Sequence, residues 1–181
     1  GADASNNPIE FVGNVPGCVH TDLMEAGIIG KDIFYRDNGK NIQWIEDRNF
    51  SYTKEFEVND LDKMPKDGAY LCFEGLDVYC DVYLNGELIG KGDNCHLRYT
   101  FDVKELLNEG ENNVRVYFYS PVKYVEEIYK KEGAPINSNG QNGIVFVRKP
   151  QCHFGWDWGP VLVPSGITRD IYLDFVSVAA V

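Results

Sequence analysis

The sequence predicts an all-β domain: an antiparallel β-sandwich of the jelly-roll type with one or two short helices. Apolar and polar residues alternate over several short runs, which is the pattern of half-buried strands. Turn residues separate these runs at intervals of about 8–12 residues, as in sandwiches. Helical periodicity is confined to two short stretches. Together these observations favour a sandwich over a mixed α/β fold.

The N-terminal part predicts a loop followed by a short helix. Thr21 or Asp22 is a suitable N-cap for a helix over residues 23–26, and Gly27 would end it. Residues 30–48 are rich in aromatic, Asp, Asn and Gly residues without a clear period. We therefore expect an irregular connection there.

Period-two alternation predicts most strands between residues 50 and 118. The apolar face of the first run holds Phe50, Tyr52, Phe56 and Val58. Lys54 interrupts that face. Further runs cover residues 71–73, 78–84, 97–103 and 114–118. Asn85-Gly86 lies between two of these apolar segments and predicts a two-residue hairpin, because both residues tolerate a positive φ.

A second helix is expected after these strands. Ser120 is a capping residue and Pro121 suits the first helical position. One helical face would hold Val122, Val125, Ile128 and Tyr129. Gly133 would stop the helix. Residues 144–149 predict a short strand, and residues 171–175 predict the last strong one.

Composition excludes several classes of function. The 181 residues suit a single domain, and 44% hydrophobic residues are enough for a packed core. The 17 basic and 28 acidic residues give a formal net charge of −11, so the surface repels phosphate groups. We expect no nucleic-acid partner and no membrane partner. No apolar run approaches the roughly 20 residues of a membrane span.

Cysteine and histidine placement argues against a metal site. The five cysteines include no CxxC pair, and the three histidines are far apart, so we expect neither a metal nor another cofactor. Cys72 and Cys80 lie in strand-like runs and fit small core residues. His20 and His153 fit hydrogen-bonded loop residues better than ligands.

The most distinctive stretch is Phe154-Gly155-Trp156-Asp157-Trp158-Gly159-Pro160. Two indoles flank one carboxylate, and the glycines and proline disfavour regular structure. Sugars bind such a combination, because their C–H faces lie on indoles and their hydroxyls donate to carboxylates. The alternative is architectural: an aromatic corner that closes the sandwich, with Asp157 accepting turn amides. Both interpretations stay open on the residues alone.

Eight short motifs follow one another over nearly the whole chain. They are Val-Pro-Gly-Cys-Val-His-Thr-Asp-Leu (15–23), Gln-Trp-Ile-Glu (43–46), Tyr-Thr-Lys-Glu-Phe (52–56), Gly-Leu-Asp (75–77), Val-Tyr-Leu-Asn-Gly (82–86), Phe-Val-Arg-Lys (146–149), Trp-Asp-Trp-Gly-Pro (156–160) and Ser-Gly-Ile-Thr-Arg-Asp (165–170). Together they resemble the N-terminal sugar-binding domain of family 2 glycoside hydrolases. The first motif and the run 154–160 resemble the β-mannosidase branch in particular.

The resemblance implies a galactose-binding-like jelly roll over residues 1–181, packed on a catalytic barrel that carries two glutamates. The barrel would lie outside this chain, and the family's opening strand would precede residue 1. We therefore expect part of a longer enzyme that lacks one strand, is inactive alone and contains no catalytic residue.

The resemblance also assigns roles within a substrate pocket. Asp157 would accept hydrogen bonds from the hydroxyls of a terminal mannose, in a mannoside or an oligosaccharide, and Trp156 would help to wall the pocket. Arg148 would either orient Asp157 or lie in solvent. Trp158 fits a packing residue of the loop better than a sugar platform. Trp44 would pack at the junction with the next domain.

Two other functions remain compatible with the sequence. The chain could be an autonomous carbohydrate-binding module, or a structural domain that only buttresses a barrel. The compartment is not determined by the sequence; the resemblance favours a periplasmic or lysosome-like compartment over the cytoplasm.

Overall fold

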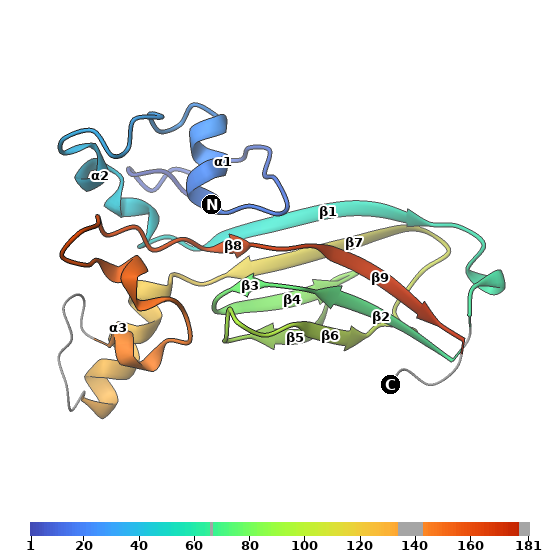
Figure 1. Cartoon of the computed structure of the whole chain (residues 1–181). Helices are drawn as coiled ribbons and strands as arrows, with labels where there is room; N and C mark the ends of the chain where they lie inside the picture. Colours follow the sequence, from blue (N-terminus) through green and yellow to red (C-terminus); the bar gives the residue numbers. More distant parts are fainter. Residues whose placement is uncertain (66, 134–142, 178–181) are drawn as a thin grey trace.

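The computed structural model describes residues 1–65, 67–133 and 143–177, and it confirms the predicted antiparallel β-sandwich (Figure 1). One sheet has the strand order β1-β7-β4-β5, formed by β1 (Phe50–Val58), β7 (Gly110–Phe118), β4 (Cys80–Leu84) and β5 (Glu87–Gly92). The second has the order β6-β2-β9, formed by β6 (Tyr99–Asp102), β2 (Gly68–Phe73) and β9 (Ile171–Val176). A short third sheet pairs β3 (Leu76–Asp77) with β8 (Gly166–Ile167).

The main core lies between the two larger sheets. One buried cluster contains Val116 and Phe118 of β7 together with Leu71 and Phe73 of β2. Within each strand the two buried residues are two positions apart. Burying a side chain of this size contributes roughly 1.5–3 kcal/mol. The period-two pattern of the sequence therefore marks the positions that hold the sheets together.

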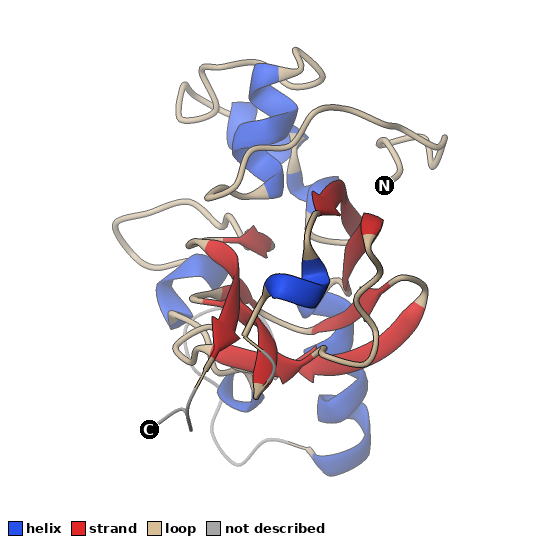
Figure 2. Ribbon diagram, turned by 90° about the vertical axis from the view of Figure 1, so that its right-hand side faces the viewer, coloured by secondary structure: helices blue, strands red, loops and turns tan. Residues whose placement is uncertain are grey.

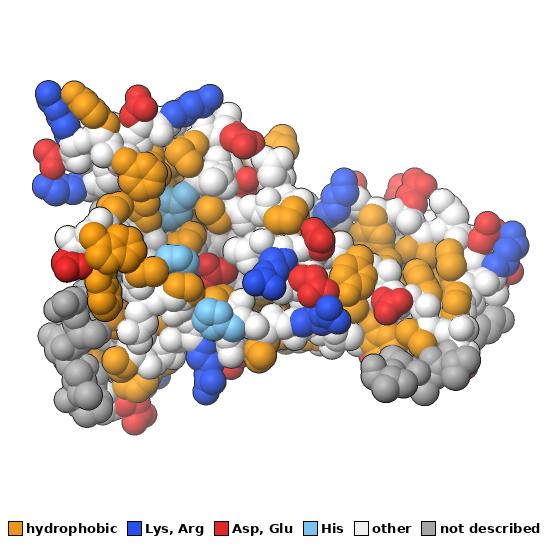
Figure 3. Space-filling view, viewed as in Figure 1, with side chains coloured by type: hydrophobic (Ala, Val, Ile, Leu, Met, Phe, Trp, Pro, Cys, Tyr) orange, Lys and Arg blue, Asp and Glu red, His pale blue; other side chains and the backbone are white. Residues whose placement is uncertain are grey.

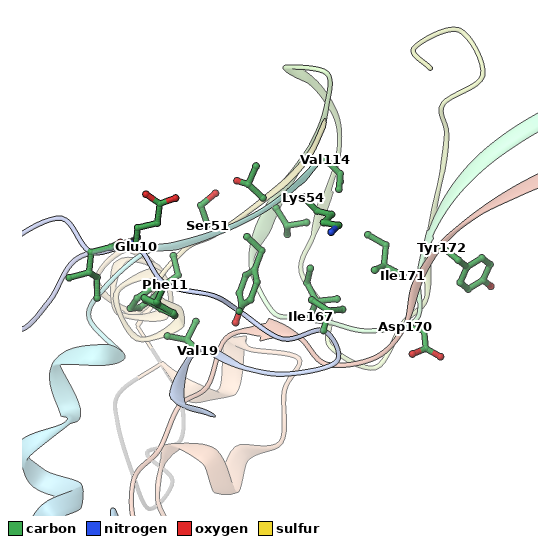
Figure 4. A pocket seen from close by; sticks show the side chains of 18 residues that line it. Glu10, Phe11, Val19, Ser51, Lys54, Val114, Ile167, Asp170, Ile171 and Tyr172 are labelled. Carbon is green, nitrogen blue, oxygen red and sulfur yellow. Dashed lines mark hydrogen bonds between the residues drawn. The ribbon is translucent and has the colours of Figure 1, made fainter. Parts of the chain in front are cut away.

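β1 and β9 are edge strands, and a hollow of about 720 Å³ lies between them (Figure 4). Lys54 of β1 and Ile171 of β9 line it, together with Val114 and Val116 of β7. Lys54 is exposed although its neighbours on the same face of β1 are buried or half-buried, because the hollow gives its ammonium access to water. The described lining does not include residues 156–158, so this hollow is separate from the predicted sugar site.

The helix α1 (Val19–Glu25) begins earlier than the sequence predicts. Its N-cap is Cys18, whose backbone N–H donates to Thr21 Oγ1 at 3.3 Å. Thr21 and Asp22 lie inside the first turn, so the predicted cap is wrong; a side chain in that turn satisfies the cap amide instead. The predicted end is confirmed, since Gly27 follows the helix with a φ of 71°.

Asp22 is buried because it joins three segments of the chain. Its carboxylate accepts the backbone N–H of Asn14 at 3.0 Å and the hydroxyl of Tyr52 at 2.6 Å. Charge-assisted hydrogen bonds of this kind offset the loss of water around a carboxylate. Through Tyr52, which lies in β1, the helix α1 is held against the edge of the four-stranded sheet.

The connection over residues 30–48 is more ordered than predicted. It contains the one-turn helix α2 (Asn38–Asn41) and the 3-10 turn η1 (Gln43–Ile45), and a similar turn, η2 (Leu61–Lys63), follows β1. Segments this short show no hydrophobic period, so the sequence pattern could not indicate them.

The helix α3 (Pro121–Glu132) confirms the second predicted helix. Ser120 is its N-cap, and its hydroxyl oxygen accepts the backbone N–H of Lys123 at 3.1 Å. Val125 is buried on the predicted apolar face. The C-cap is Gly133, with a φ of 64°.

The strand predicted over residues 144–149 is wrong. The chain forms the 3-10 turn η3 (Ile144–Phe146) there, and a second turn, η4 (Gln151–Phe154), follows. Ile144 and Val147 are both buried. Their spacing of three residues fits a tight helical turn better than a strand, in which it would place them on opposite faces.

The helices and long loops gather at one end of the sandwich. Figure 1 places α1, α2, α3 and the loops before β8 at this end, and Figure 2 shows α3 on the side of the sheets opposite the N-terminal helices. Two further apolar clusters fix them: one around Val19, Leu23 and Phe50, and one that joins Val125 of α3 to Phe154. The loops of this end are thus held by packing, although they lack regular structure.

Near the start of β7, the buried side chain of Asn112 forms hydrogen bonds with the connection that leads from β6 to β7. Its amide donates to the carbonyls of Asn108 at 2.9 Å and Gly110 at 3.0 Å. Its Oδ1 accepts the backbone N–H of Asn108 and the side-chain amide of Asn85, each at 2.9 Å. Asn85 is the first residue of the predicted hairpin turn, so this network joins two turns of the sandwich.

We expect Asn112→Ala to lower the free energy of unfolding by about 2–3 kcal/mol, because it removes four partly buried hydrogen bonds at once. Urea denaturation followed by circular dichroism measures this. Asn113→Ala is the matched control, since its backbone N–H, and not its side chain, bonds to Asn85. Equal effects of the two substitutions would contradict the prediction.

Candidate functional site

A turn at the helical end of the sandwich carries the predicted sugar-binding residues. Phe154 is fully buried in the cluster that contains Val125. Gly155 follows with a φ of 100°, a conformation that favours glycine, and redirects the chain outward. Residues 156–159 then form a tight turn, in which the N–H of Gly159 donates to the carbonyl of Trp156 at 3.3 Å. Buried Phe154 therefore anchors the turn, and Gly155 directs it into solvent.

The three central side chains of this turn lie on the surface. Trp156 is 44% exposed, Trp158 is 76% exposed, and Asp157 between them is also exposed. Within the described part of the chain, no side-chain hydrogen bond or ion pair of Asp157 occurs. The turn is closed by its backbone, so the carboxylate lone pairs face outward and can accept hydrogen bonds from a ligand.

The structure does not bring Arg148 into contact with Asp157. The Arg148 side chain is exposed and, in the described ranges, forms no ion pair with Asp157. Its backbone carbonyl accepts the N–H of Cys95 at 3.0 Å, which ties this part of the chain to the loop that follows β5. Trp44 is half-buried beside the α1 cluster. The roles given to Arg148, Trp158 and Trp44 stay predictions.

Behind the turn lies a buried polar cluster that the sequence did not indicate. The ammonium of Lys149 donates to the carboxylate of Asp77 and, at 2.8 Å, to the carbonyl of Pro164. The Lys149 side chain is 0% exposed and that of Asp77 is 5% exposed. One signal was available: Lys149 stands two residues after buried Val147, which places both on the same side of an extended chain.

His20 and His153 border this cluster, and for His20 the predicted place in a hydrogen-bonded loop is wrong. His20 lies in α1 and is buried, and neither of its ring nitrogens has a partner in the described structure. His153 lies in η4, and its buried Nδ1 likewise has no partner there. The His20 ring is enclosed by packing and the His153 ring is half-buried, which a sequence read one segment at a time does not show.

Burial controls the charge state of these groups. Loss of water, and then the nearby Lys149 ammonium, lower the pKa of His20 to about 4. The same two causes lower the pKa of His153. Burial also lowers the pKa of Lys149, while the Asp77 carboxylate beside it acts in the opposite direction. Near neutral pH both histidines are therefore uncharged neighbours of a buried ion pair.

Hydrophobic side chains gather on the surface around this site. Figure 3 shows them, together with histidines, at the end of the molecule where α1, α2 and α3 lie. Among the large exposed hydrophobic residues are Phe34 and Tyr35, which precede α2, and the two tryptophans of the turn. A surface of this kind suits contact with a ligand or another domain.

Three other expectations concern metals, thiols and membranes. All five cysteines are free thiols, and Cys72 and Cys80 are buried, as predicted. Across the described residues, no group of three His, Cys, Asp or Glu side chains is arranged to hold a metal ion. None of the described helices has the length and apolar character needed to cross a membrane.

Residues 2–169 match the family model described as glycosyl hydrolase 2 galactose-binding domain-like. The chain belongs to this family. The resemblance predicted from the motifs is thereby confirmed, and so is the galactose-binding-like fold. The match extends through the Trp156–Gly159 turn and ends just before β9.

Relatives within this family are β-mannosidases. The chain is 34% identical to the Rattus norvegicus β-mannosidase over 182 residues and 36% identical to that of Bos taurus over 184 residues. These alignments cover 96% and 97% of this chain but 20% of each relative. The chain therefore spans about a fifth of the length of the curated relatives it matches.

Solved structures show the same relationship. The crystal structure of a β-D-mannosidase from Dictyoglomus thermophilum matches with a TM-score of 0.85 and 42% identity, over 90% of this chain and 20% of that one. An exo-chitosanase from Amycolatopsis orientalis matches with a TM-score of 0.65 and 22% identity over 91% of this chain and 17% of that one, which shows the fold alone.

We expect His20 to make folding pH-dependent. In the unfolded chain its imidazole binds a proton near pH 6.5, but in the folded chain only near pH 4. Between these values the unfolded state holds more protons, so acidification lowers the free energy of unfolding, by about 3 kcal/mol in total. Urea denaturation from pH 7 to pH 4 should show a shallower decline for His20→Leu than for the parent. The control is His96→Leu, which replaces an exposed histidine; parallel declines for all three proteins would refute the assignment.

Proposed function

We propose that this chain is the N-terminal accessory domain of a β-mannosidase, which hydrolyses terminal β-D-mannose residues of glycosides. In this proposal the domain packs on a catalytic domain and lends the Trp156–Gly159 turn to its substrate pocket. The observation that carries the proposal is the exposed carboxylate of Asp157, held between two exposed indoles on a turn with a buried anchor. The names of the relatives supply the substrate class.

Asp157 is the residue to which we assign direct contact with the sugar. A hydrogen bond from a hydroxyl to a charged acceptor contributes roughly 1.5–3 kcal/mol. If the bond is better aligned in the transition state than in the bound substrate, this energy accelerates the reaction rather than only tightening binding. Trp156, half-exposed beside the carboxylate, would cover a C–H face of the same sugar.

The hydrolysis itself is assigned to the catalytic domain. A retaining glycosidase needs two carboxyl groups about 5 Å apart, one as nucleophile and one as acid and base. We assign neither to this chain, because Asp157 is exposed on a turn and has no second carboxylate among its described contacts. The domain thus supplies binding and orientation, and the proposal requires a partner surface for the pocket to be complete.

We expect Asp157→Ala in the complete protein to lower kcat/KM for an aryl β-mannoside at least tenfold, because the substrate loses one charged hydrogen bond. The melting temperature, measured on the same preparation, should stay unchanged, since the described contacts of the turn do not use this carboxylate. Asp62→Ala, at an exposed position in η2, is the matched control and should leave both quantities unaltered. A lower melting temperature with an unchanged kcat/KM would contradict the prediction and show that Asp157 has an architectural role.

We expect the 181-residue chain alone to bind mannose with a dissociation constant above about 1 mM, because half of a pocket covers half of the ligand. Titration by NMR measures this directly. Micromolar binding would instead support an autonomous carbohydrate-binding module, in which Trp158, with its exposed ring, would serve as a sugar platform.

A further inference from the structure

A single ammonium group holds both ends of the segment that carries the site. Lys149 begins this segment and donates to the carbonyl of Pro164, which ends it. The same ammonium donates to the carboxylate of Asp77 in β3. Asp77 in turn pairs with Gly166, two residues beyond Pro164, at the start of β8. Both ends of residues 149–164 therefore meet at one point on the β3–β8 sheet.

Stability alone does not account for this buried ion pair. The side chains of Lys149 and Asp77 are almost completely removed from water, and the loss of hydration can exceed the attraction between the charges. Replacing such a pair by uncharged side chains of similar volume is often neutral for folding. A charged pair does give direction, however, because an ammonium donates along defined hydrogen bonds and a hydrocarbon chain does not.

Among the described contacts, the side chains at the tip of the turn are not held by hydrogen bonds, whereas its base is. Phe154 anchors it on one side, and on the other the carbonyl of Val161 accepts the side-chain amide of Gln43 at 2.8 Å. The side chains of residues 156–158 form no hydrogen bond with other described residues. The base of the turn is braced by the backbone N–H of Leu162, which donates to the carbonyl of His153 at 3.0 Å. The direction in which Asp157 points is therefore set by the backbone of the whole segment, whose two ends the Lys149–Asp77 pair joins.

We infer that Lys149 and Asp77 are positioning residues for the reaction: their buried pair holds residues 149–164 so that Asp157 meets the sugar. This inference rests on the proposed function. Neither residue touches the substrate; both act through Asp157. Displacements of about 1 Å can reduce catalysis a hundredfold, so a device that fixes the ends of this segment affects the rate directly.

The test removes both charges together. Lys149→Met alone would leave a buried carboxylate without a partner and can prevent folding, so the variant is Lys149→Met/Asp77→Asn, which keeps similar volumes. The matched control is Lys91→Met/Asp81→Asn, which removes the 2.9 Å ion pair between β5 and β4. All proteins are compared at a temperature at which circular dichroism shows them folded.

The kinetic measurement compares two backgrounds in the complete protein. We expect the Lys149/Asp77 variant to lower kcat/KM for an aryl β-mannoside at least fivefold when Asp157 is present, and less than twofold when Asp157 is already alanine. The control variant should change kcat/KM less than twofold in both backgrounds. An equal loss in both backgrounds would show a general structural effect and would overturn the inference, as would an unchanged rate.

A second measurement does not depend on activity. The 181-residue chain has three tryptophans, so labelling with 5-fluorotryptophan gives three ¹⁹F resonances, assigned by Trp156→Phe and Trp158→Phe. We expect the Lys149/Asp77 variant to shift or broaden the signals of Trp156 and Trp158 and to leave that of Trp44 in place. If the complete protein proves not to hydrolyse mannosides, the proposed function fails, and these spectra alone decide whether the Lys149–Asp77 pair positions the turn. Unchanged signals of Trp156 and Trp158 would overturn it.

Discussion

The packing of two antiparallel sheets on one apolar core determines where every other part of this chain can lie. Phe73 of β2 and Phe118 of β7 belong to this core, and both are fully buried. Because alternate residues of each strand are committed to this core, the polar groups of the connections must be satisfied at the ends of the sandwich. The candidate site therefore lies in the loops at one end, which the smaller clusters around Leu23 and Phe154 hold in place.

The candidate site combines a rigid foundation with an exposed tip. Phe154 fixes the start of the turn by packing, and Gly155 allows the abrupt change of direction that brings the next residues to the surface. Behind the turn, the Lys149–Asp77 pair lies beside two uncharged histidines, so the surroundings of the buried charges stay dry and their hydrogen bonds strong. A site of this design presents a carboxylate to a ligand without disturbing the sandwich.

The sequence predicted what depends on local pattern and missed what depends on distant partners. Alternation located the strands between residues 50 and 118, and a capping serine with proline located α3, because these signals are contained in the segments themselves. The run 144–149 was misread because its buried residues are three apart, a spacing too short to establish a period. The burial of Lys149 could not be predicted fully, because its partners lie 72 and 15 residues away in sequence. His20 was missed for the same reason.

The position of Lys54 has a consequence for how this protein behaves in concentrated solution. β1 and β9 are edge strands of the described sheets beside a hollow lined by apolar and charged side chains, and an edge strand can pair with a strand of a neighbouring molecule. A strand added at β1 would enclose the lysine ammonium and remove its water. A charge on the inward face of an edge strand opposes pairing with a strand of another molecule, and this is the effect of the break in the apolar pattern of β1.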